Sequence, residues 1–274
     1  MTVAPAQHQA AEPTPLRLNP VSIAVALLAA ALVAWVVTVE RMRGMDAGPG
    51  TNLGGLGWFV GIWVTMMAAM MLPSVAPMVL AFARVSKERA RRRQVTFVPT
   101  WVFVAGYIAA WTLYGLLAYG LFRAVDSVSG GVLAWDRAGP YLAGGAIIAA
   151  GLYQLTPVKD VCLRHCRTPL HFILHDWHEG RLGALRMGAE HGVYCVGCCW
   201  GLMVVLFSLG VMSLFWMAVI AGVIFVEKVF PYGMRLTRVF AVAFIALGIW
   251  IAVSPGSVPG LTQPDSNPSM GMTP

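Results

Sequence analysis

The stretch HGVYCVGCCWGLM, residues 191–203, contains three of the five cysteines in this chain of 274 residues. Positions three and four apart share one face of a helix. That face would carry an imidazole, three thiols and a thioether, from His191, Cys195, Cys198, Cys199 and Met203. Soft sulfur ligands with an imidazole suit Cu(I) or Zn(II) better than Mg or Ca, so we predict a metal site here. The alternative is that these side chains only fill space in a core.

The composition is that of an integral membrane protein. Hydrophobic residues make up 58% of the chain and charged residues 11%, and the mean hydropathy is +0.71. Soluble domains carry about 25% charged residues. The net charge of +7 does not indicate nucleic acid, because the basic residues lie in short loops between apolar runs. All cysteines fall within residues 162–199, a clustering that favours thiol or metal chemistry over a disulfide framework.

Seven apolar runs predict an all-α, polytopic transmembrane helical bundle over residues 20–254. The runs are Val21–Val39, Trp58–Ala83, Val98–Phe122, Ala138–Leu155, Gly192–Leu209, Gly210–Val226 and Val239–Val253. Residues 1–19 and 255–274 are expected to form disordered tails. A polar segment, 156–191, lies between the fourth and fifth runs and contains cysteines and histidines. Its glycines, with the one that follows, suggest close backbone packing before the Cys-rich run: Gly180, Gly183, Gly188 and Gly192.

The distribution of basic residues predicts the orientation. With the N-terminus in the cytoplasm, 15 of the 19 Lys and Arg residues lie in inner segments and 4 in outer ones. Cytoplasmic loops are enriched in these residues. We therefore expect a multi-pass protein of a bacterial-type inner membrane, with the N-terminus inside and the C-terminus outside. A single re-entrant element between residues 192 and 227 would instead place the C-terminus inside.

The second apolar run carries a methionine motif, Met-Met-Ala-Ala-Met-Met-Leu-Pro, at residues 66–73. Its thioethers are candidate Cu(I) ligands that need no deprotonation: Met66, Met67, Met70 and Met71. Pro73 removes a backbone donor and frees a carbonyl group, and broken helices of this kind mark substrate sites in transporters. The alternative is that the methionines are adaptable packing around a kink.

The polar segment contains a second pair of thiols. Cys162 and Cys166 are four residues apart, with His165 beside them, and can chelate a metal from one helical turn. They could instead form a reversible disulfide, although a cytoplasmic location disfavours it. Lys159 lies nearby and would favour thiolate.

Glu227 and Lys228 end the sixth apolar run. Ionisable residues at such a depth are candidates for function. The alternative is that the two residues are an interfacial anchor. No phosphate-binding loop, nucleophile elbow or paired-carboxylate hydrolase site is apparent in the sequence, which favours a transporter or metal-binding protein over an enzyme.

Four motifs together resemble the DUF2182 family, which is described as predicted metal-binding integral membrane proteins. They are Met66–Pro73, Pro157–Pro169, His191–Met203 and Glu227–Lys228, and the resemblance covers roughly residues 57–250. It implies a metal-binding membrane protein associated with copper or copper-chelate uptake.

The sequence thus predicts a membrane protein that binds and transports a soft metal through Met and Cys ligands. Copper, as Cu(I) or a small chelate, is the expected cargo, and zinc is the other candidate. The partners are membrane lipid and the metal, not nucleic acid. Two alternatives stay open: a membrane thiol-redox protein, and an assembly factor that delivers metal to a membrane oxidase.

Overall fold

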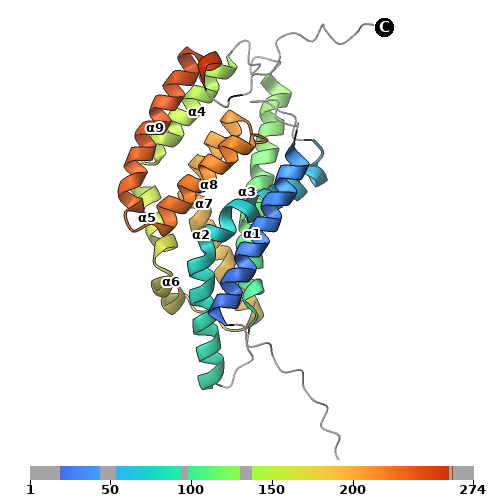
Figure 1. The fold of residues 1–274 in the computed structure, drawn as a ribbon, viewed down its shortest axis with the longest axis vertical. Helices are drawn as coiled ribbons and strands as arrows, with labels where there is room; N and C mark the ends of the chain where they lie inside the picture. Colours follow the sequence, from blue (N-terminus) through green and yellow to red (C-terminus); the bar gives the residue numbers. More distant parts are fainter. Residues whose placement is uncertain (1–18, 44–53, 94–97, 130–137, 259–260, 262–274) are drawn as a thin grey trace, which may run out of the picture.

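The computed structural model of the chain describes residues 19–43, 54–93, 98–129, 138–258 and 261 (Figure 1). Within these ranges the regular structure is entirely helical, which confirms the predicted all-α class. The elements are α1 (Pro20–Met42), α2 (Leu56–Arg93), α3 (Thr100–Ser129), α4 (Gly139–Tyr153), α5 (Pro157–Arg167), α6 (Pro169–His175), α7 (Gly180–Leu209), α8 (Leu214–Val229), α9 (Gly233–Val253) and the 3₁₀ turn η1 (Pro255–Ser257). Of the predicted tails, residues 1–18, 259–260 and 262–274 lie outside the described residues, and η1 lies at the start of the C-terminal one.

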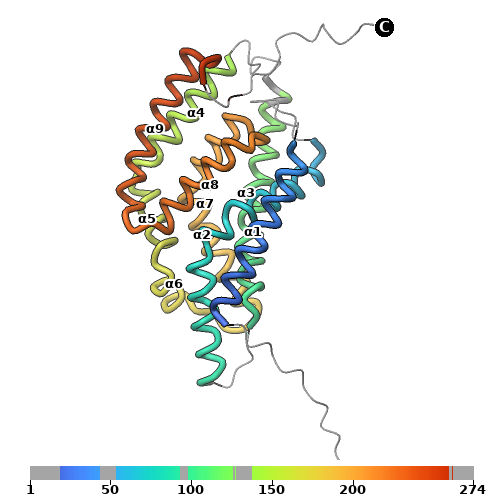
Figure 2. Tube along the Cα trace, in the orientation of Figure 1, coloured from blue at the N-terminus to red at the C-terminus, as the bar shows by residue number. Residues whose placement is uncertain are grey.

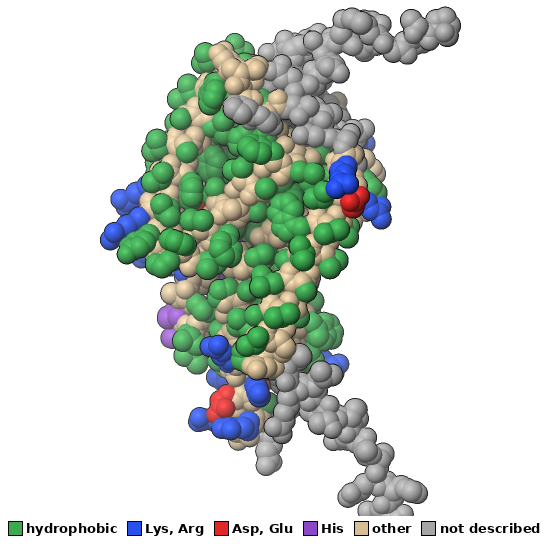
Figure 3. All heavy atoms as spheres, in the orientation of Figure 1, with side chains coloured by type: hydrophobic (Ala, Val, Ile, Leu, Met, Phe, Trp, Pro, Cys, Tyr) green, Lys and Arg blue, Asp and Glu red, His purple; other side chains and the backbone are tan. Residues whose placement is uncertain are grey.

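The long helices form one bundle in which successive elements run in alternating directions (Figures 1 and 2). α1 begins at the lower end of Figure 1 and α9 ends at the upper end. α3 packs along α7, α4 along α9, and α1 along α2, while α8 contacts α2, α7 and α9. Hydrophobic side chains cover most of the face in Figure 3, and Lys and Arg gather at its margins.

The number of helices long enough to cross a membrane is smaller than the seven predicted. Among the described residues, α1, α2, α3, α7 and α9 are long and apolar enough, and α4 with α5 would make a sixth span bent by 65°. α8 has 16 residues. At 1.5 Å per residue it is about 24 Å long, which is less than the hydrocarbon thickness of about 30 Å. Seven full spans are therefore not confirmed.

α2 continues through both of its prolines. It is one helix of 38 residues, longer at both ends than the predicted run, with Pro73 and Pro77 inside it. The Ser74 hydroxyl donates to the carbonyl oxygen of Met71, 3.0 Å away. The predicted break in this helix is not observed, because the helical path persists on both sides of each proline.

α7 starts twelve residues before the predicted run, at Gly180 rather than Gly192. Glycines account for this longer contact with α3. A methyl group added at Gly188 would meet the carbonyl oxygen of Phe103, and one at Gly192 would meet the side chain of Ala110. Small residues let helix backbones approach closely in membranes. The close packing predicted from the glycines is confirmed at these two positions.

Candidate metal centre

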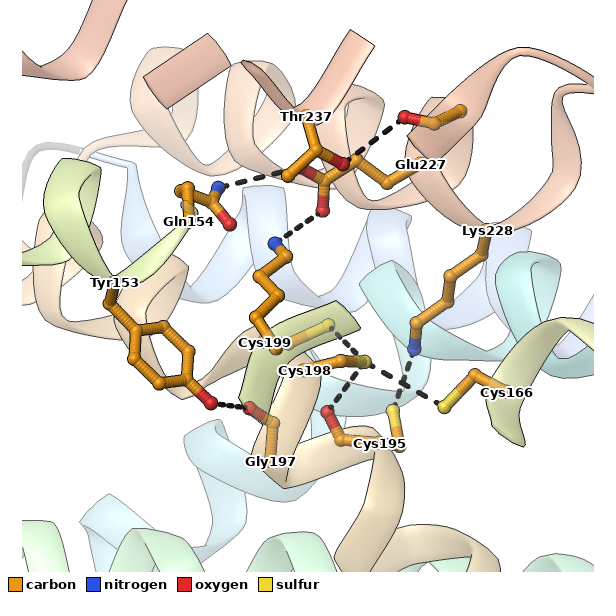
Figure 4. Close-up of polar contacts among 12 residues, drawn as sticks. Tyr153, Gln154, Cys166, Cys195, Gly197, Cys198, Cys199, Glu227, Lys228 and Thr237 are labelled. Carbon is orange, nitrogen blue, oxygen red and sulfur yellow. Dashed lines mark hydrogen bonds and ion pairs between the residues drawn. The ribbon is translucent and has the colours of Figure 1, made fainter. Parts of the chain in front are cut away.

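Three thiols form a compact group on α7. The Sγ atoms of Cys195, Cys198 and Cys199 all lie within 4.8 Å of one another, and all three side chains are buried (Figure 4). Cys198 Sγ is 3.4 Å from Cys199 Sγ and donates to the carbonyl oxygen of Cys195 at 3.2 Å. All five cysteines of the chain are free thiols. The predicted spacing of three and four residues therefore does bring sulfur atoms together.

α5 brings a fourth thiol to this group. Cys166 Sγ lies 3.7 Å from Cys198 Sγ (Figure 4). Cys162 faces the same turn of α7, because a methyl group added at Gly197 would meet its sulfur. The sequence pattern presented these two cysteines as a separate site, whereas the structure joins them to the α7 cysteines. We refer to Cys162, Cys166, Cys195, Cys198 and Cys199 together as the thiol cluster.

The turn between α4 and α5 explains this approach. Thr156 caps α5, since its hydroxyl accepts from the backbone N–H of Lys159, and Pro157 occupies the first helical turn. Together they start a new helix at 65° to α4. α5 consequently lies across α7 and α8 instead of continuing along α9.

Cys195 has two polar neighbours from other helices. Lys228 on α8 donates from Nζ to Cys195 Sγ at 2.7 Å (Figure 4). The Tyr107 hydroxyl on α3 is 3.0 Å from the same sulfur. Both side chains are buried. The Lys228 ammonium is thus the nearest positive charge to the thiol cluster and a direct partner for a Cys195 thiolate.

Glu227, the residue before Lys228, forms a buried ion pair with α5. Its Oε2 is 2.7 Å from Lys159 Nζ, and both side chains are at most 1% exposed. Gln154 Nε2 donates to the other carboxylate oxygen at 3.4 Å. The two charges are therefore inside the bundle and paired between helices, which does not fit an interfacial anchor.

Arg167 on α5 forms hydrogen bonds with the C-terminal end of α8. Its guanidinium donates to main-chain carbonyl oxygens at the end of α8, those of Glu227, Phe230 and Pro231. The C-terminal end of a helix carries partial negative charge, which favours a guanidinium there. The contact therefore holds α5 close to both Glu227 and Lys228.

Several predicted ligands lie outside the compact thiol group. His191 is buried among the rings of Phe103, Tyr107 and Phe172, and its Nδ1 has no hydrogen-bond partner among the described residues. Four residues of helix advance about 6 Å, so His191 lies a turn before Cys195, and Met203 a turn after Cys199. The i, i+4 pattern correctly predicts a shared face, but the side chains on that face are spread along the helix axis and do not meet at one point.

The remaining predicted ligands are separate from the thiols. His165 stacks on Tyr194, with ring centroids 4.5 Å apart, and its Nδ1 contacts the carbonyl oxygen of Val161. The four methionines of the α2 motif are buried in the hydrophobic core. Burial among apolar side chains is what adaptable packing residues show, and the role of these methionines as ligands stays a prediction.

Tyr107 and Gln154 belong to this region and were not identified from the sequence. Each is a polar side chain within or at the end of an apolar run. Such a group needs an internal partner when it is buried, and this is the signal that could have identified both. Which partner each finds depends on packing between helices that are distant in sequence.

Comparison with known proteins identifies a family. Residues 60–251 match the family PpoB2, described as a copper chaperone. No curated protein and no solved structure matches the chain. The matched region begins in α2 and ends in α9, so it includes every residue of the thiol cluster and both buried lysines. The chain therefore belongs to the PpoB2 copper chaperone family.

Proposed function

We propose that this protein binds Cu(I) at the thiol cluster and hands it to an acceptor or moves it across the membrane. The family, the apolar helices and the buried cysteines fit a membrane copper-binding protein. The observation that carries the proposal is the convergence of three buried Sγ atoms with one buried ammonium group.

The spacing of the sulfur atoms supports metal binding. A metal–sulfur bond of about 2.3 Å, as in zinc thiolates, places opposed sulfurs about 4.6 Å apart and trigonal ones about 4.0 Å apart. The three Sγ atoms on α7 lie within 4.8 Å of one another. Small side-chain adjustments would therefore allow two or three of them to bind one ion.

The charges support Cu(I) in particular. A monovalent copper ion on two thiolates carries a net charge of −1, and the Lys228 ammonium cancels it. An uncompensated charge in a buried site is costly. Soft thiolates select Cu(I), whereas a structural zinc site usually needs four ligands.

Cys166 supports a transfer step. Its sulfur lies 3.7 Å from Cys198 Sγ but on a different helix, so copper could exchange from α7 thiolates to α5 thiolates. In this proposal α5 is the cytoplasmic side of the route, because 15 of the 19 basic residues then lie inside. His191, Met203 and the methionines of α2 are proposed as secondary positions along the route. The DUF2182 resemblance and the inner-membrane location remain predictions within this proposal.

The first experiment is elemental analysis of detergent-purified protein, after growth with added copper and zinc under reducing conditions. We expect about one copper ion per chain in the unaltered protein and none after the double change Cys195→Ser with Cys199→Ser. Ser208→Ala is the control, since this hydroxyl on α7 donates only to the carbonyl oxygen of Val204, and it should retain copper. An unchanged copper content per chain in a folded double variant would contradict the proposal. Zinc in place of copper would indicate a zinc site instead.

A thiol-redox function is the second candidate, favoured by the close approach of sulfurs on α5 and α7. Oxidation of Cys166 and Cys198 would form one S–S bond and release two protons and two electrons to a quinone or thioredoxin-like acceptor. Counting free thiols before and after reaction with such an acceptor tests this. Loss of two thiols per chain in metal-free protein, together with absence of bound copper, would favour this function.

Transport and delivery need a separate test. The total copper content of cells that lack the protein distinguishes transport from delivery, because loss of a transporter changes total uptake. Loss of a delivery factor changes only the copper content of its acceptor. The description of the family as a copper chaperone favours delivery.

A further inference from the structure

A second polar site lies outside the thiol cluster, at the junction of α4, α5 and α9. It is a pocket of about 290 Å³. The polar residues that line it are Gln154, Asp160, Arg164, Arg235, Thr237 and Arg238. Neither the copper chemistry proposed above nor the predicted metal ligands use this pocket.

The pocket has an excess of positive charge. It is lined by three arginines and one aspartate, and none of these four side chains forms an ion pair within the part of the chain that the structure describes. Figure 3 shows Lys and Arg side chains gathered at the left margin, over the lower end of α9. Guanidinium groups bind phosphate and carboxylate oxygens through paired N–H donors. An anion is therefore the ligand that this lining would attract.

Gln154 provides an independent indication of a ligand. The residue is 3% exposed, and its Nε2 donates to Glu227, but its Oε1 has no hydrogen-bond partner in the part of the chain that the structure describes. A buried carbonyl oxygen without a donor is unfavourable. Gln154 also lines the pocket, and rotation of its buried amide would present this oxygen to a ligand that carries a donor. The ligand would then combine anionic oxygens with an O–H group.

The start of α9 adds to the positive potential. No side chain caps this helix, and its first turn, through Met234 and Arg235, lines the pocket. The N–H groups of Gly233 and Arg235 already donate to the carbonyl oxygens of Phe230 and Tyr232, so the contribution of this helix end is its dipole, which favours anions. Above it, Val239 and Val242 on α9 and Leu152 on α4 are largely exposed apolar side chains. This surface could accept acyl chains whose headgroup sits in the pocket.

We infer that the pocket binds a phosphate group accompanied by a hydroxyl donor, supplied either by an anionic phospholipid headgroup or by free phosphate. The arginines bind the phosphate oxygens, and the hydroxyl group donates to Gln154 Oε1. Basic pockets between membrane helices hold phospholipid headgroups in this way. The inference is independent of copper binding and would stand if that proposal failed.

The experiment is native mass spectrometry of the full chain in detergent with added phosphatidylglycerol, with phosphatidylcholine as the neutral-headgroup comparison. We expect retention of phosphatidylglycerol over phosphatidylcholine, and about tenfold weaker retention in the double variant Arg235→Gln with Arg238→Gln. Arg91→Gln with Arg92→Gln removes the same charge from the far end of α2 and should leave retention unchanged. Equal loss in both double variants, or equal binding of both lipids, would overturn the inference for lipid.

Free phosphate is tested separately by ³¹P NMR titration of inorganic phosphate. Binding of phosphate that Arg235→Gln with Arg238→Gln removes, without preference for phosphatidylglycerol, assigns the site to the soluble anion. Binding of neither probe overturns the inference altogether. If the double variant does not fold, as judged by its thermal unfolding, Arg164→Gln is the second variant, with the same expectation.

Discussion

At the scale of single residues, Cys195 differs from the other thiols in its neighbours. It alone has both an ammonium and a phenol hydroxyl within hydrogen-bond distance, from Lys228 and Tyr107. A buried thiolate is costly without such partners. Cys195 is therefore the thiol that we expect to be ionised before a metal arrives.

Replacing Lys228 tests its role as a counter-charge. Lys228→Met removes the ammonium and leaves metal-bound thiolates uncompensated, so we expect Cu(I) affinity to fall about 10–100-fold, as for other residues that support metal ligands. Competition with a colorimetric Cu(I) chelator measures this. Lys87→Met, an exposed lysine on α2, is the charge-matched control. Equal affinity of Lys228→Met and the unaltered protein would contradict the assignment.

The buried pair between Lys159 and Glu227 makes a prediction about stability. Glu227→Gln leaves a buried ammonium without its carboxylate and should lower the free energy of unfolding by about 3–5 kcal/mol. Lys159→Met combined with Glu227→Gln removes both charges and should cost less than the sum of the single changes. Thermal unfolding in detergent gives all three values. Additive effects would mean that the pair is not coupled.

The sequence could predict only part of this site, because local spacing determines which residues share a face but not which helices meet. The α7 thiols follow from spacing of three and four residues. Cys166 and Lys228 join them through contacts with residues 32 and 33 positions away. Those contacts depend on the bend before α5 and on the position of α8, which periodicity does not encode.

At the scale of elements, the contact between α3 and α7 positions the site. Tyr107 on α3 reaches Cys195 on α7 across a contact where glycine backbones lie close to the opposite helix. The glycines in residues 180–192 correctly indicated close packing. The predicted start of this helix at Gly192 was wrong, because the polar residues from Gly180 onward belong to the same helix.

Gly188→Ala tests this contact. The added methyl group would meet the carbonyl oxygen of Phe103, so the helices must separate, and we expect a loss of about 1–3 kcal/mol in unfolding free energy. Gly120→Ala on α3 is the matched control, because no atom lies within 4 Å of its added methyl group. The melting temperatures of both variants, measured by thermal unfolding, test this expectation. A similar melting temperature for both would show that α3 and α7 are less tightly packed.

At the scale of the whole molecule, hydropathy predicted the membrane class and the helical content but not the number of full spans. Each predicted apolar run coincides with a helix, yet α4 and α8 have only 15 and 16 residues. Residue hydropathy measures how apolar a run is. It does not reveal where within such a run a helix begins and ends.

The orientation makes a prediction about the two faces. The alternating helix directions place the start of α1 and the end of α9 at opposite ends of the bundle (Figure 1). With 15 of the 19 basic residues on the inner side, a phosphatase fused after residue 274 should be active outside the membrane. Fluorescence of a green fluorescent protein fused there would instead place the C-terminus inside and show that α8 does not cross.

The order of the neighbouring residues Glu227 and Lys228 determines which charge faces which helix. Consecutive residues of a helix point about 100° apart, so this acid and base face α5 and α7 separately. Exchanging the two would leave length, composition, net charge and hydropathy identical. It would nevertheless turn an ammonium toward Lys159 and a carboxylate toward the Cys195 sulfur. Two chains with the same composition, net charge and hydropathy would thus differ in whether the buried charges at the centre of the bundle attract or repel one another.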